Sequence, residues 1–204
     1  PPTATPVPPT PTPTPQPFVR WSNWKTGEWA PSSTPPECGP LEKMFEILPI
    51  DISFVNEFSS PGRPGGDNSL YLAHGYLRSH NTPYDQIEVK FPAKGFSLYA
   101  ANRRLEDYYI RGKETDTIKH IVSSGEEQVK LEFHHPCGIA VMIDHLAQIP
   151  DKWMKIIEDV PVLKNSSVVT FMPPGQYFVE SGEVLAHAIG HATNTYVDFG
   201  VYDL

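Results

Sequence analysis

Short segments in which apolar residues alternate with polar ones recur along the chain after residue 40. Alternation with a period of two predicts half-buried β-strands, and the Gly and Pro residues between the segments predict tight turns. Strands this short and closely spaced are typical of an antiparallel, all-β domain. The predicted strands are Ile47–Phe54, Leu70–His74, Ile87–Phe91, Phe96–Ala100, Asp107–Ile110, Gln128–His134, Ile139–Ile143 and Val168–Met172, with Pro92–Gly95 as a turn.

The end of the chain repeats this pattern most clearly. Val179–Gly190 has apolar residues two apart with glycines at its corners, and the alternating segment Tyr196–Asp203 follows it. Successive side chains of a strand point to opposite faces. The last strand should therefore place Tyr196 and Asp198 on one face, with Val197 on the other.

One helix is predicted, and one further segment has the length of a single helical turn. Asp151–Glu158 has apolar residues at positions 153, 154, 156 and 157, and Asp151 is a candidate N-cap. Leu41–Phe45 has the length of a single turn. The predicted fold is thus an antiparallel β-sheet or sandwich with one short helix.

Composition divides the chain into three parts. Residues 1–17 form a Pro/Thr tract, which favours extended conformations, cannot build a packed core, and suits a disordered stalk. Residues 18–40 contain Trp21, Trp24 and Trp29 and are expected to pack irregularly on the domain, although the three rings could instead stack on a ligand. Residues 41–204 form the predicted β domain.

Net charge bears on the class of binding partner, and the two cysteines bear on the compartment in which the protein resides. The net charge is −8 without a basic stripe, which argues against nucleic acid, and no apolar run approaches the ~20 residues that span a bilayer. Cys38 and Cys137 are compatible with one disulfide of an exported protein or with two separate thiols. We expect a signal or lipoprotein anchor ahead of Pro1, which would place the domain outside a bacterial cell, at its surface, with membrane contact only through that anchor.

Several segments resemble the lysostaphin-like zinc endopeptidases, a family that cleaves peptidoglycan. The resemblance rests on Pro92–Gly95 with the strand after it, on Ala140-Val-Met-Ile-Asp-His145, on Val179–Gly190, and on Tyr196-Val-Asp-Phe-Gly-Val201. It covers the chain from about Asn68 to the C-terminus. The fold it implies is the family's compact antiparallel sheet, the duplicated hybrid motif.

The family's catalytic pattern is only partly present. A His-x3-Asp motif supplies two zinc ligands there, and its approximate counterpart is His80-Asn-Thr-Pro-Tyr-Asp85, which has one residue too many. A His-x-His motif supplies the third ligand and a general base, but Tyr196 and Asp198 stand in those places. His145-Leu146 matches the His-Leu dipeptide that contains a further histidine of the family. Tyrosine, with a reference pKa near 10, is a poor base at neutral pH.

The sequence is compatible with three functions. The first is a noncatalytic cell-envelope domain that binds peptidoglycan or an envelope protein, with His74, His187 and Tyr196 as candidate binding residues. The second is a zinc-dependent peptidoglycan hydrolase with noncanonical ligands, for which the candidates are His80, Asp85 and Asp198 as ligands and Tyr196 and His145 as catalytic groups. The third is a carbohydrate-binding module that uses the tryptophans.

Overall fold

The computed structural model describes residues 18–23, 27–62, 72–111 and 118–204. Strands make up 44% of the structure and helices 10%, so the prediction of an all-β protein is confirmed. The Pro/Thr tract at 1–17 and Trp24 lie outside the described residues. No helix in the described ranges is long and apolar enough to cross a membrane.

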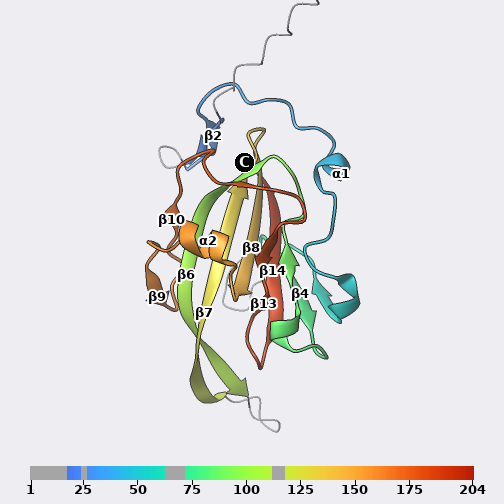
Figure 1. Ribbon diagram of the computed structural model, residues 1–204, viewed down its shortest axis with the longest axis vertical. Helices are drawn as coiled ribbons and strands as arrows, with labels where there is room; N and C mark the ends of the chain where they lie inside the picture. The colour runs from blue at the N-terminus through green and yellow to red at the C-terminus, as the bar shows by residue number, and fades with distance from the viewer. Residues whose placement is uncertain (1–17, 24–26, 63–71, 112–117) are drawn as a thin grey trace, which may run out of the picture.

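Most of the described strands belong to one large sheet (Figure 1). Its order is β10-β6-β7-β8-β14-β4-β3, with β9 and β11 also pairing with β6 and β13 pairing with β8. These pairings are antiparallel except that of β6 with β9. The strands are β3 (Glu57–Ser59), β4 (Gly75–Ser79), β6 (Phe96–Arg111), β7 (Ile118–His134), β8 (Ile139–Ala147), β9 (Val162–Lys164), β10 (Thr170–Phe171), β11 (Phe178–Val179), β13 (Ala188–Ile189) and β14 (Thr195–Asp203).

One face of this sheet is covered by the hydrophobic core. Leu131 and Phe133 of β7 and Val197 of β14 are fully buried there, and Trp153 of α2 (Asp151–Ile156) packs edge-on against Phe133 at 5.6 Å. Figure 1 shows α2 lying across this part of the sheet. The remaining covering elements are α1 (Leu41–Met44), the 3₁₀ turns at Ile52–Phe54 and Tyr84–Gln86, α2 (Asp151–Ile156), and the two-stranded sheet of β5 (Val89–Lys90) with β12 (Val184–Ala186).

The other face of the sheet is polar, as strand alternation requires. Gln128 and Lys130 alternate with the core residues of β7, and Asp144 alternates with those of β8. On β14, Tyr196 and Asp198 both reach the side chain of His145, whereas Val197 belongs to the core. The predicted division of the last strand into two faces is therefore confirmed.

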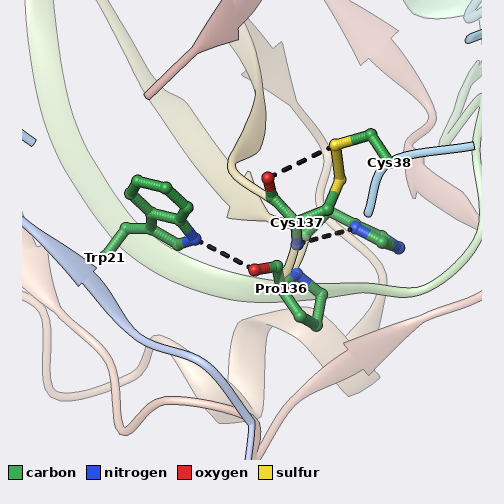
Figure 2. The surroundings of a disulfide bond; sticks show 5 residues. Trp21, Cys38, Pro136 and Cys137 are labelled. Atoms are coloured by element: carbon green, nitrogen blue, oxygen red, sulfur yellow. Dashed lines mark hydrogen bonds between the residues drawn. A yellow bond between two sulfur atoms is a disulfide. The ribbon is translucent and has the colours of Figure 1, made fainter. Parts of the chain in front are cut away.

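The N-terminal segment is fastened to the turn between β7 and β8 (Figure 2). The structure contains the Cys38–Cys137 disulfide, which confirms the pairing considered from the sequence. Trp21, in the short pairing of β1 (Trp21–Ser22) with β2 (Ala30–Pro31), is buried and donates its indole N–H to the carbonyl of Pro136 at 3.0 Å. Gly138 allows this contact, since a Cβ there would lie 2.8 Å from the Trp21 ring.

Three local predictions are wrong. Ile47–Phe54 is not a strand but a bend followed by a 3₁₀ turn, which Asp51 caps through the backbone N–H of Ser53. In the described part of Leu70–His74 there is no strand, because β4 begins only at Gly75. The helix at Asp151 is confirmed, but Pro150 is its N-cap and Asp151 is the first helical residue.

Candidate functional site

The polar face has its densest charge cluster around His145, near the end of β8. The backbone of His145 is left-handed, with φ of 63°, and its carbonyl accepts a hydrogen bond from the N–H of Gly190 at 2.7 Å. Gly190 must be glycine, because its φ is +62° and a Cβ would lie 2.2 Å from the carbonyl oxygen of Asn194. The glycine-bounded segment singled out in the sequence therefore helps to position this histidine.

Both ring nitrogens of His145 have partners. Nδ1 lies 3.3 Å from Glu106 Oε2 and 3.3 Å from Gln128 Oε1. Nε2 lies 2.9 Å from Tyr196 Oη and 3.6 Å from Asp198 Oδ2. The ring is buried, so these contacts replace water as its hydrogen-bonding environment.

Two carboxylates face each other directly across β8 and β14, because Asp144 pairs in register with Asp198. Like charges in this position destabilise a sheet unless they are neutralised. Arg104 Nη2 lies 2.8 Å from Asp144 Oδ1, and His74 Nε2 lies 3.1 Å from Asp198 Oδ2. Arg104 is itself buried and also contacts Glu106. The cluster is therefore a network of mutually neutralising charges.

The network shifts the protonation of its members. Burial disfavours a charged His145, but the carboxylates of Asp144, Asp198 and Glu106 outweigh burial and raise its pKa to about 9. Burial opposes ionisation of Glu106 as well, yet His145 and Arg104 lower its pKa to about 2.

The pKa values of Tyr196 and Asp198, both on the last strand, shift in opposite directions. Burial raises the pKa of Tyr196 far above its usual value, and the neighbouring carboxylates raise it further. Burial also opposes the charge on Asp198, but hydrogen bonds from His145 and His74 hold its pKa well below the usual range. At neutral pH the site therefore holds an imidazolium, a neutral phenol and carboxylates.

Two hollows open on this face. The first has a volume of about 700 Å³ and contains His145, Tyr196 and Arg104 in its wall, together with amide and hydroxyl side chains such as Asn165. The second has a volume of about 410 Å³ and is bounded by Trp29, Met142 and Tyr202. Lys130 and Asp144 line both hollows, so the two adjoin across β7 and β8, and together they are called the trough here. Pockets of this size hold ligands as large as a short peptide.

The structure does not bring the predicted zinc ligands together. Asp198 pairs with Tyr76 of β4, and His80 follows four residues later, which is about 13 Å along a strand. His80 is exposed and lies 3.1 Å from Glu57, while Asp85 is exposed in a 3₁₀ turn. Within the ranges that the structure describes, no three His, Cys, Asp or Glu side chains are grouped to hold a metal ion.

The other candidates divide between two places. Tyr196, His145 and His74 meet around Asp198, as described above. His187 lies elsewhere: it is exposed, its Nδ1 is 3.3 Å from Glu88 Oε2, and its backbone N–H bonds to Gln148. Of the proposed binding residues, His74 and Tyr196 therefore belong to one site and His187 does not.

Sequence reasoning missed much of the charge network. Arg104, Glu106, Gln128 and Asp144 contact His145 or its partners, and none was a candidate. One signal was available, because Asn102, Arg104 and Glu106 are spaced two apart in a strand and so share a face.

No protein-family model matches the chain, no curated protein matches it, and no solved structure matches it.

The charge network predicts a pH dependence of stability. The pKa of His145 is near 6.5 when unfolded and about 9 when folded, so its contribution is complete below pH 6.5 and is lost as pH rises through 9. We expect the free energy of unfolding, measured by urea denaturation, to fall by about 3 kcal/mol between pH 6.5 and pH 9.5. Glu106 and Asp198 act oppositely: their contribution is lost as pH falls below about 4.5.

A variant isolates the alkaline part of this dependence. Asn tolerates the left-handed backbone of position 145, so His145→Asn should fold while lacking the titrating ring. Its stability should change little between pH 6.5 and pH 9.5. Equal slopes in the parent and in the variant would show that the ring does not carry this effect.

Proposed function

We propose that this chain is a noncatalytic domain of the bacterial cell envelope, which binds the peptide part of peptidoglycan in the trough on its polar face. The observation that carries the proposal is the protonation of the site. A general base works best when its pKa lies near the operating pH and it has a free lone pair. His145, with its pKa of about 9 and both nitrogens engaged, has neither property.

The remaining groups are equally unsuited to proton transfer. Tyr196 keeps its proton because its pKa is raised, and Asp198 is a weak base because its pKa is lowered. Each is also held by the network, since Tyr196 contacts His145 and Asp198 contacts His74. These side chains form a rigid, charged wall, which suits recognition of a ligand better than its conversion.

The trough supports binding of a peptide. Its first hollow is lined by amide and hydroxyl groups, including Asn165, Ser166 and Ser167, which can pair with peptide groups of a ligand. The resemblance of the β8 and β14 segments to peptidoglycan endopeptidases supplies the ligand class and the envelope location. It also supplies the finer fold assignment, the duplicated hybrid motif, which we include in the proposal.

The proposal is tested by sedimentation with purified, insoluble peptidoglycan. We expect the protein to sediment with the polymer, and Ser167→Trp, which places a large ring in the first hollow, to weaken binding at least tenfold. Ser60→Trp is the matched control, since Ser60 is also exposed but lies just beyond β3, outside both hollows. Equal sedimentation of both variants would place binding outside the trough, and absence of sedimentation would refute the proposal.

A second candidate function is carbohydrate binding, which Trp29 favours. Trp29 is half-buried, is held edge-on by Tyr99 and His134 at 6.1 and 5.5 Å, and bounds the second hollow. Aromatic rings held in this way can stack on sugars. Trp21 does not share this role, because it is buried against Pro136 and Gly138.

A further inference from the structure

Lys130 lies on the polar face, at the border between the two hollows. It lies on β7 between Gln128 and Glu132 on the same face, it is half-buried, and it lines both hollows of the trough. Lys130 therefore lies where the two hollows adjoin. A ligand that occupies both hollows would extend past this residue.

Four carboxylates that line the trough with Lys130 already contact other partners. Asp144 pairs with Arg104, and Glu106 pairs with Arg104 and His145. Farther out in the trough, Asp107 pairs with Lys164 and Glu132 pairs with His134. Among the residues that the structure describes, no carboxylate lies within 4 Å of the ammonium of Lys130, in contrast to Arg104 beside it.

We infer that Lys130 binds a carboxylate of the ligand, and that this carboxylate lies in the middle of the ligand. The inference rests on the proposed function and deepens it by naming the group that is recognised. An ammonium group without a carboxylate partner in the protein can form a strong, charge-assisted hydrogen bond with a carboxylate of a ligand. Because a hollow continues on each side of Lys130, the ligand extends in both directions from its charge.

This position selects a chemical class of peptide. A C-terminal carboxylate ends a ligand, whereas an acidic residue within a peptide leaves a carboxylate free in the middle of the chain; in the peptide part of peptidoglycan this residue is a glutamyl residue linked through its γ-carboxyl. On one side of the carboxylate the ligand would lie in the second hollow, against Met142, Tyr202 and Trp29. On the other side it would lie in the first hollow, against amide and hydroxyl groups. The preferred ligand is thus a γ-glutamyl peptide with a free α-carboxylate, not its α-amide.

Two probes that differ by one charge test the inference: N-acetyl-L-Ala-γ-D-Glu-L-Lys and the same peptide with its α-carboxylate amidated. We expect calorimetry with the full chain to show the free acid binding roughly tenfold or more tightly than the amide. Lys130→Met should remove this preference, and Lys130→Arg should retain most of it because it keeps the charge. Lys155→Met is the matched control, since Lys155 is exposed on α2, which covers the opposite face.

The outcomes separate this inference from the proposed function. Equal affinity of the parent for both probes, or a preference that survives Lys130→Met, overturns the role of Lys130. If neither probe binds but the protein still sediments with peptidoglycan, the inference fails and the proposed function stands. If the protein binds neither the probes nor the polymer, both fail.

Discussion

Replacing Arg104 with methionine is expected to lower the free energy of unfolding by about 3–5 kcal/mol at pH 7. Arg104 is buried, and it pairs with both Asp144 and Glu106. Removing its charge leaves Asp144 without this cation, and Glu106 with His145 alone, in a poorly solvated place. Asp144 also directly faces Asp198 across the sheet, so the variant restores a repulsion that the parent neutralises.

Urea denaturation of the parent and the variant measures this effect. Arg78→Met is the matched control, because Arg78 also lies on the polar face but pairs with the more exposed carboxylate of Glu57. Its loss of stability should be much smaller, since solvent-exposed pairs contribute little. A loss below about 1 kcal/mol for Arg104→Met would mean that the buried network does not hold the sheet together as described.

Removing the disulfide should have an effect of similar size. The bridge joins Cys38 to Cys137 over 99 residues, so it restricts the unfolded chain strongly. We expect the double variant Cys38→Ser, Cys137→Ser to lose about 2–5 kcal/mol of unfolding free energy.

The folded structure predicts what the double variant keeps. Trp21 still donates to Pro136 and packs on Gly138, so the N-terminal segment should remain in place and the indole fluorescence should stay close to that of the parent. Peptide mapping without reductant checks the bridge directly. Two titratable thiols in the folded parent, or an unchanged stability of the variant, would contradict this account.

The sequence predicted those parts of the fold that depend on local pattern. The alternation of Tyr196, Val197 and Asp198 sets their faces correctly because strand geometry has a fixed period. By contrast, Ile47–Phe54 alternates but forms no strand, since the 3₁₀ turn capped by Asp51 interrupts it. Periodicity therefore does not reveal whether a segment has a partner strand.

The site was harder to predict, because its members come from four strands (β6, β7, β8 and β14) and from His74, just before β4. His145 was recognised beside Leu146 in the sequence, but its partners Glu106 and Gln128 are brought to it only by the register of β6, β7 and β8. The proposed ligand set failed for the same reason: Asp198 and His80 are on opposite ends of a strand pairing. No local spacing encodes such a register.

The most direct test of the central claim is one incubation of the protein with purified peptidoglycan in the presence of zinc. The sedimented polymer is assayed for bound protein, and the supernatant for newly released amino groups. Binding without release of amino groups is the result that the charge network around His145 predicts, since the raised pKa values of His145 and Tyr196 keep both groups protonated at neutral pH. Release of amino groups that stops when zinc is chelated would contradict the account.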